Sequence, residues 1–254
     1  MLIDTHCHIH EIDYPLNIAD TIQRAHEAGV DQLLCVGTSL DSSSRAVSFA
    51  AEHAEAYASL GVHPHDTKGG WKKLAQIEQS DKVIAIGEIG LDYFYTNSPR
   101  ETQIEALKWQ VELALSRNLP IMFHVREAFD DFWPIFDSYS GIRGELHSFT
   151  DSQENLDKAL ARGLYIGVNG ISTFTKDVAQ QAMFASIPLE KLLLETDAPF
   201  LTPTPFRGKV NEPAFVKNVA EYHATIRGIS LEDLTSATTA NAHALFAFYT
   251  NTPI

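Results

Sequence analysis

The feature that most constrains the fold of this chain is a regular alternation of short apolar runs with longer stretches of helical periodicity. The runs are rich in aliphatic and β-branched residues, whereas the longer stretches place apolar residues three and four positions apart. We predict strands over residues 2–8, 32–37, 56–62, 83–89, 120–125, 144–149, 164–168 and 192–197. Strands that alternate with helices predict repeated βα units and a parallel sheet.

Eight parallel strands are the number that closes a barrel, and such barrels commonly need about 250 residues. Helices over residues 17–28, 43–55, 101–117, 154–162, 177–186, 215–227 and 231–246 would form the outer ring. Gly29 and Gly163 follow two of these stretches, as glycines that end helices do. A loop rich in proline and threonine, 199–213, would cover one barrel face. We therefore predict one α/β domain, a (β/α)8 TIM barrel over residues 1–254.

The net charge and the shortness of the apolar runs argue against a DNA-coating protein and against a membrane protein. A net charge of −14 at pH 7 repels polyanions, so local cations or metals would have to attract a nucleic-acid substrate. The charge also argues against an extended DNA-coating surface. No apolar run approaches the roughly 20 residues that span a bilayer, and the amino terminus lacks a basic segment before an apolar one. We expect a cytoplasmic protein that does not bind membranes, and no obligate protein partner is inferred.

The two cysteines, Cys7 and Cys35, both lie within apolar strand-like runs. Their spacing does not suggest a disulfide framework. Cys7 lies between His6 and His8, so on a strand it points to the opposite face from theirs. We predict that Cys7 is a buried packing thiol.

His6 and His8 stand near the end of the first predicted strand. The period of two in a strand places both imidazoles on one face. In a barrel of this kind, the active site lies at the carboxyl ends of the strands. A His-x-His pair is a weak signal alone, so its interpretation depends on the other strand ends.

Polar residues also stand at or near the ends of four other predicted strands, and they are Glu88, His124, His147 and Asp197. A polar group in an apolar run is costly unless it is paired or coordinates an ion. Each residue alone is better explained as a satisfied core histidine or a carboxylate bound to backbone amides. Together with the histidine pair, at matching strand ends, they predict a metal site. Four imidazoles and two carboxylates suit Zn, Mn, Fe or Co and tolerate Mg, so the ligand types do not identify the metal.

With these residues the chain resembles the TatD family of metal-dependent deoxyribonucleases, within the amidohydrolase-like barrels. The matching strings are Asp-Thr-His-Cys-His at 4–8, Gly-Val-His-Pro-His at 61–65, Gly-Glu-Ile-Gly-Leu-Asp at 87–92, Phe-His-Val-Arg at 123–126, His147, Glu-Thr-Asp-Ala-Pro-Phe-Leu at 195–201, Arg-Gly-Lys-Val-Asn-Glu-Pro at 207–213 and Thr-Thr-Ala-Asn-Ala at 238–242. They occur in order over nearly the whole chain. One departure follows His147, where Ser-Phe-Thr-Asp replaces the family's frequent Cys-Phe-Ser-Gly. That difference puts the substrate contacts of this loop in question.

The resemblance implies a site for two divalent metal ions, Mg, Mn or Zn. His6, His8 and Asp197 would hold one ion, His124 and His147 the other, and Glu88 would bridge them. A metal-activated hydroxide would attack phosphorus in line. Asp197, bound to a metal beside the water, is the candidate that accepts its proton. Glu88 and Asp197 are thus the predicted catalytic residues.

Residues around the predicted centre are candidates for substrate binding. His63 and His65 end the third strand and could hold a phosphate, or they could be exposed imidazoles of a turn fixed by Pro64. Arg126 lies two residues past His124 and could clamp a phosphate with two hydrogen bonds, or form a surface salt bridge.

Other candidates follow the fourth and eighth strands. Asp92 could orient a ligand histidine or cap the following helix. Arg207, in the loop after strand eight, adds positive charge to an acidic protein, although loop solubility would explain it equally well. The aromatic residues 93–95 could stack on a base or pack at the barrel rim.

We therefore predict a hydrolase that cleaves DNA phosphodiester bonds, as an exonuclease or at sites of damage. The alternative is the same centre acting on a carboxylic ester or amide such as D-aminoacyl-tRNA, because fold and ligands do not fix the substrate. A non-catalytic scaffold is disfavoured by the intact set of six candidate ligands.

Overall fold

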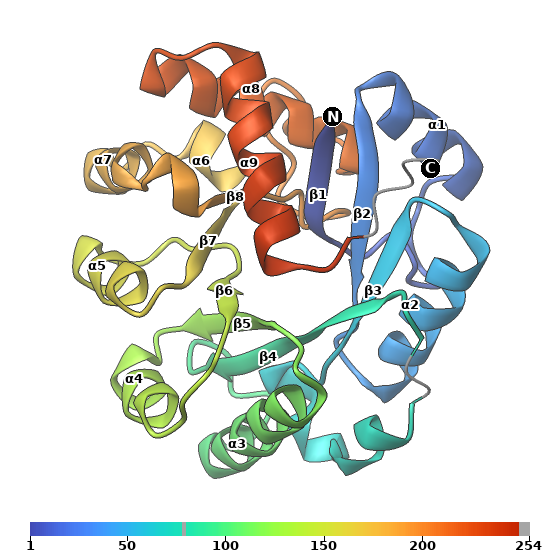
Figure 1. The fold of residues 1–254 in the computed structure, drawn as a ribbon, viewed down its shortest axis with the longest axis vertical. Coiled ribbons are helices and arrows are strands. Elements are labelled where there is room, and N and C mark those ends of the chain that lie inside the picture. The colour runs from blue at the N-terminus through green and yellow to red at the C-terminus, as the bar shows by residue number, and fades with distance from the viewer. Residues whose placement is uncertain (78–79, 249–254) are drawn as a thin grey trace.

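A sheet of eight parallel strands, in the order β1 to β8, forms the centre of the molecule. The computed structural model describes residues 1–77 and 80–248. The strands are β1 (Leu2–Cys7), β2 (Val30–Val36), β3 (Ala56–Leu60), β4 (Val83–Asp92), β5 (Ile121–Arg126), β6 (Gly144–Leu146), β7 (Tyr165–Val168) and β8 (Leu192–Leu194). In Figure 1 the chain colours follow one another once around the ring, and most helices lie outside the strands. The predicted (β/α)8 barrel is confirmed.

The barrel closes between β1 and the chain that follows β8. The N–H of His8 donates to the carbonyl of Ala198 at 2.8 Å, and the N–H of Asp197 donates to the carbonyl of His6 at 2.8 Å. The Thr5 hydroxyl donates to the carbonyl of Leu194 at 3.1 Å. These bonds bring His6 and Asp197 side by side from opposite ends of the sequence.

The described residues form the seven predicted helices, each within a few residues of its expected bounds, and two further helices. They are α1 (Ile18–Glu27), α2 (Leu40–Glu52), α3 (Arg100–Arg117), α4 (Phe129–Asp137), α5 (Gln153–Ala161), α6 (Ile171–Phe174), α7 (Val178–Ser186), α8 (Val216–Arg227) and α9 (Leu231–Leu245). Short 3-10 helices cover Pro64–Gly69, Lys72–Gln76, Leu189–Lys191 and Pro213–Phe215. Helix α2 starts earlier than predicted because the Ser39 side chain accepts the Ser42 N–H and caps it. Gly29 and Gly163 have φ values of 85° and 80°, as expected of residues that end helices.

The sequence predicted neither α6 nor α4, which packs on β5. Phe129, Phe132, Trp133 and Phe136 are buried there. These four positions have the i, i+3, i+4, i+7 spacing of an amphipathic helix, but Pro134 inside the segment argues against a helix interior.

Strands β6 and β8 are shorter than predicted. They end at Leu146 and Leu194, and the chain then turns through Ser148, with φ of 49°, and Asp197, with φ of 59°. Residues with side chains rarely adopt this left-handed conformation, which ends strand pairing. His147 and Asp197 therefore lie on turns at the carboxyl ends of strands, where the barrel exposes them to a substrate.

Both faces of most strands are buried, as expected for a parallel sheet covered by helices. Cys7 is fully buried in this core, as predicted, and both cysteines are free thiols. Within residues 1–77 and 80–248, no helix has the length and apolar character needed to cross a membrane. The predicted domain end at residue 254 lies outside the described residues.

Candidate metal centre

Six predicted ligands come together at the carboxyl ends of the strands. His6, Glu88 and His124 belong to β1, β4 and β5, whereas His8, His147 and Asp197 follow β1, β6 and β8. Groups of three possible ligands, each with its ligand atoms within 4.8 Å, are His6–His8–Asp197, His6–Glu88–His147 and His63–Glu88–His124. Because the groups share His6 and Glu88, they form one continuous cluster.

The first group, which we call the Asp197 side, consists of His6, His8 and Asp197. The Nε2 atoms of the two histidines are 3.1 Å apart. Oδ1 of Asp197 lies 3.6 Å from Nε2 of His6 and 3.3 Å from Nε2 of His8. Two imidazole nitrogens and a carboxylate oxygen thus converge on one point, as the ligands of a divalent cation do.

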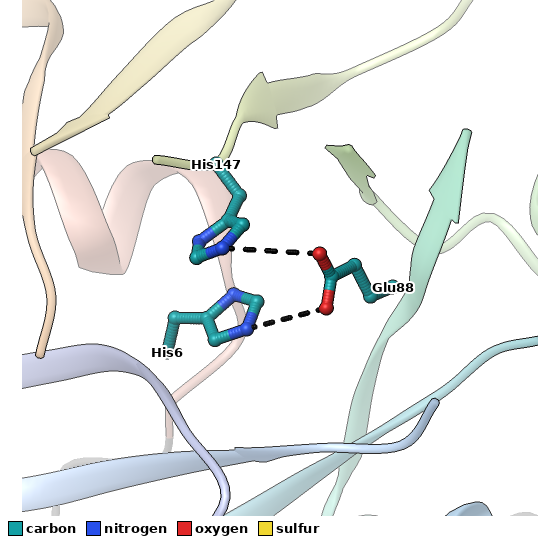
Figure 2. A group of neighbouring side chains, drawn as sticks. All are labelled: His6, Glu88 and His147. Carbon is teal, nitrogen blue, oxygen red and sulfur yellow. Dashed lines mark ion pairs between the residues drawn. The ribbon is translucent and has the colours of Figure 1, made fainter. Parts of the chain in front are cut away.

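Glu88 lies at the centre of the cluster and reaches both of its sides. Oε2 is 3.6 Å from Nε2 of His6, while Oε1 is 2.8 Å from Nδ1 of His124 and 3.8 Å from Nε2 of His147. Figure 2 shows His6 and His147 facing the two oxygens of this carboxylate. The position of Glu88 is that expected of a residue between two ligand groups.

The other side contains a residue that the resemblance did not place there. His63 lies with Nε2 3.6 Å from Oε1 of Glu88, beside His124, and these two histidines with Asp92 form what we call the Asp92 side. Among the described residues, His124 and His147 do not meet in one group of three. The His147 ring instead stacks on His6 at 3.4 Å between centroids, which holds it toward the Asp197 side.

Each candidate histidine ligand on the cluster's edge has a hydrogen-bond partner on its other ring nitrogen. His8 Nδ1 faces the Val36 carbonyl at 3.0 Å, His124 Nε2 faces Asp92 at 3.0 Å, and His147 Nδ1 faces Glu195 at 2.9 Å. Such partners fix the orientation and tautomer of metal-binding histidines.

Glu195 is a supporting residue to which sequence reasoning gave no role. Its carboxylate is fully buried and also accepts the Ser148 N–H at 2.8 Å and the Asn169 amide at 3.1 Å. A Cβ at Gly167 would lie 2.4 Å from Oε2 of Glu195, so glycine leaves room for this carboxylate. The available signal was its position two residues before Asp197, in an otherwise apolar strand.

The protonation of three residues of the cluster, His6, His63 and Glu88, suits a bound cation. Burial lowers the pKa of His6 to about 4 and that of His63 to about 3, so both imidazoles are neutral and keep a lone pair for a metal. Burial also acts to lower the pKa of His147, but the charges of Glu195 and Glu88 outweigh it and raise this pKa to about 10. Burial opposes ionisation of Glu88, yet His63 and His147 hold its pKa well below the usual range. His6, His63 and Glu88 therefore fit a divalent cation as they stand, whereas a cation that binds His147 would displace its proton.

Asp92 contacts a candidate ligand histidine, which is one of the two alternatives that the sequence left open, but it does not cap the following helix. Oδ2 lies 3.0 Å from Nε2 of both His65 and His124. Oδ1 accepts the N–H groups of Phe94 and Tyr95. It therefore caps the turn after β4 rather than a helix, and it orients His124 at the same time.

Of the other predicted substrate contacts, some line the cavity above the cluster and one does not. Arg126 lines the cavity above the cluster, which has a volume of about 590 Å³, together with His63 and His65. Its guanidinium carbon lies 3.9 Å from the Phe94 ring centre. Arg207 instead lies over Phe174, at 3.8 Å, and does not belong to the described residues that line this cavity.

The aromatic residues after β4 divide between the two interpretations. The Tyr93 hydroxyl donates to Asp131 at 2.5 Å, so this ring is engaged in packing at the barrel rim. Phe94 and Tyr95 are about half exposed and stack against Arg126.

Comparisons with known proteins identify the family of this chain. The family described as TatD related DNase matches residues 3–247. The chain is 37% identical over 252 residues to an uncharacterized metal-dependent hydrolase, YabD, of Bacillus subtilis strain 168, covering 97% of this chain and 99% of the relative. It is 36% identical over 238 residues to the 3'-5' ssDNA/RNA exonuclease TatD of Erwinia amylovora, covering 89% and 92%. The crystal structure of YJJV, a TatD homologue of Escherichia coli K12, superimposes with a TM-score of 0.90 at 28% identity, covering 98% of both chains.

The barrel and its cluster of histidines and carboxylates define the class of metal-dependent hydrolases. Within that class, the chain belongs to the TatD family.

Proposed function

We propose that this protein hydrolyses phosphodiester bonds of DNA, or of another nucleic acid, at a centre for two divalent cations such as Mg, Mn or Zn. The observation that carries the proposal is the central position of Glu88, whose two oxygens face ligand groups on opposite sides. Membership of a family in which one relative is named a 3'-5' ssDNA/RNA exonuclease supports the substrate class.

His6, His8 and Asp197 would hold one cation, and Glu88 would lie between the two. His124 would hold the second cation, with His147 or His63 as its partner. Cations of this kind lower the pKa of a water molecule and neutralise charge on phosphoryl oxygens.

Asp197 is the candidate proton acceptor. Burial acts to raise its pKa, but the bond from His8 and the charge of His147 hold it below the ordinary value. The carboxylate is therefore ionised at neutral pH, and it faces the cavity with 15% of its side chain exposed. An ionised carboxylate beside the reacting water can take its proton.

His63, His65 and Arg126 line the same cavity and would position the phosphate. Asp92 holds the His65 ring in place, and stacking on Phe94 holds the Arg126 guanidinium. A guanidinium fixed in this way can bind two phosphate oxygens at once. Since the whole chain has a net charge of −14, such local cations are needed to attract a polyanion.

Parallel assays test the substrate class. We would measure cleavage of single-stranded DNA and of a D-aminoacyl ester by the metal-supplied protein, with Glu88→Gln as the inactive variant. Glu105→Gln, at an exposed position of α3, is the matched control. Cleavage of DNA that only Glu88→Gln abolishes would support the proposal. Hydrolysis of the ester alone would contradict it and favour the second substrate class. Turnover of neither substrate would favour a non-catalytic scaffold.

A further inference from the structure

Phe200 is an exposed phenylalanine at the edge of the candidate centre. Its relative exposure is 61%, although it follows Asp197 by only three residues. Singly exposed apolar side chains are common on protein surfaces. Phe200 differs from them in its place, because it lines the same cavity as His8 and Asp197.

The backbone of Phe200 is held rigidly. Its N–H donates to the carbonyl of Asp197 at 2.8 Å, and the Asn211 side-chain amide donates to the carbonyls of Phe200 and Thr196. A ring on a fixed backbone loses little entropy when a ligand packs on it. This segment presents the Phe200 ring at a defined place beside Asp197.

Phe200 borders two cavities at once. One is the cavity of about 590 Å³ above the metal ligands, and the other has a volume of about 490 Å³. Both are lined by His8, Thr38 and Phe200, so they are neighbours. A volume of this size is within the range of small-molecule sites.

The second cavity differs in charge from the first. Tyr14, Pro15 and Pro199 give it apolar faces, and Glu11 and Asp13 bring two carboxylates. Its arginine, Arg45, is already paired with Glu11. A phosphate is therefore disfavoured there, whereas a neutral planar group with polar edges fits.

We propose that Phe200 stacks on the base of the nucleotide next to the scissile phosphate, and that the second cavity holds that nucleoside. The inference rests on the proposed nuclease function and names its substrate more closely. The scissile phosphate lies in the cavity above the metal ligands, and the DNA strand passes over Phe200 into the second cavity. A base held in a cavity against an aromatic ring cannot remain paired, so the substrate is single-stranded.

The test combines protein variants with oligonucleotides that lack one base. Wild type and Phe200→Ala are assayed on single-stranded DNA that is intact or abasic at each position near the cleaved bond. Removing one base lowers kcat/KM of the wild type by about tenfold, the size expected of one base–aromatic stack. Phe200→Ala lowers kcat/KM on intact DNA by a similar factor and is insensitive to the missing base. Phe200→Trp, which keeps an aromatic ring, still loses activity when that base is missing. Val178→Ala, at an exposed apolar position of α7, behaves as the wild type.

A spectroscopic measurement does not depend on turnover. Single-stranded DNA carrying 2-aminopurine at the sensitive position binds to Asp197→Asn with quenched fluorescence, and adding Phe200→Ala removes the quenching. The stacking inference is wrong if the wild type cleaves DNA but the missing base lowers kcat/KM by the same factor in Phe200→Ala as in the wild type. If wild type cleaves no oligonucleotide, the proposed function itself fails.

Discussion

The two sides of Glu88 differ in what holds their histidines. On the Asp197 side, His8 faces a neutral backbone carbonyl, that of Val36. On the Asp92 side, His124 faces the ionised carboxylate of Asp92. A carboxylate partner stabilises the protonated imidazole, whereas a carbonyl fixes the ring with less effect on its charge.

The pKa values of one buried histidine on each side also differ. Burial lowers the pKa of His6 to about 4. Burial acts in the same direction on His124, but bonds to Asp92 and Glu88 overcome it and raise the pKa to about 8. Protons therefore compete with a cation for His124 near neutral pH and hardly at all for His6. Two adjacent positions built from similar ligands thus need not bind metal equally.

Substitution of Glu88 removes a candidate ligand from both sides of the cluster and should have the largest effect on activity. We expect Glu88→Ala to lower kcat by about 10³-fold or more, because the carboxylate between the two ligand groups is lost. Asp197→Asn should be similarly inactive, because it loses both a ligand and the proton acceptor. Kinetics with saturating metal, beside circular dichroism to confirm the fold, measures this effect. Activity near that of the wild type in either variant would refute the assigned roles.

Neutralising the supporting carboxylates should affect the sides separately. Asp92→Asn should weaken metal binding on its own side, and Glu195→Gln should weaken binding through His147, each by about 10- to 100-fold. We expect the greater loss for Glu195→Gln, because this carboxylate is fully buried and also holds Ser148 and Asn169. Titration against a competing chelator gives both affinities. Equal metal affinities in the wild type and both variants would show that Asp92 and Glu195 do not support metal binding.

The pH dependence of the metal-free protein gives the smallest effect. The folded pKa of His124, about 8, lies above its ordinary value of 6.5. Protonated His124 therefore stabilises the fold below about pH 6.5, by about 2 kcal/mol, and this is lost as the pH rises through about 8. His6, with its pKa lowered to about 4, stays neutral over that range.

Thermal unfolding of chelator-treated protein measures this difference. The destabilisation caused by His124→Gln should shrink between pH 6.5 and pH 9, whereas that caused by His6→Gln should stay constant. If the destabilisation caused by His6→Gln changed with pH as that caused by His124→Gln does, the proposed difference in protonation between the two sides would be wrong.

The sequence predicted the features that depend on local periodicity. His6 and His8 share a strand face because of the period of two, and strand ends of a parallel barrel meet at one face, which brings Glu88 and Asp197 to them. The resemblance to TatD proteins supplied the bridging position of Glu88.

Features that depend on packing between distant segments were not predictable in this way. The stacking of His147 on His6, and the place of His63 beside Glu88, arise from how rings fit together across the barrel mouth. Arg207, a candidate substrate contact for which loop solubility was an equal explanation, lies over Phe174, and only the folded loop determines which aromatic ring it meets. A carboxylate such as Glu195 gains its role from partners on other strands.

Metal content measured by elemental analysis tests the central claim most directly. Wild type purified without chelators is compared with His124→Ala and with the matched control His26→Ala, whose side chain is about half exposed on α1. We predict about two divalent ions per chain in the wild type and control, a loss of at least one ion in His124→Ala, and a parallel loss of nuclease activity. A wild type that binds no metal, and stays inactive when Mg, Mn or Zn is supplied, would contradict the account.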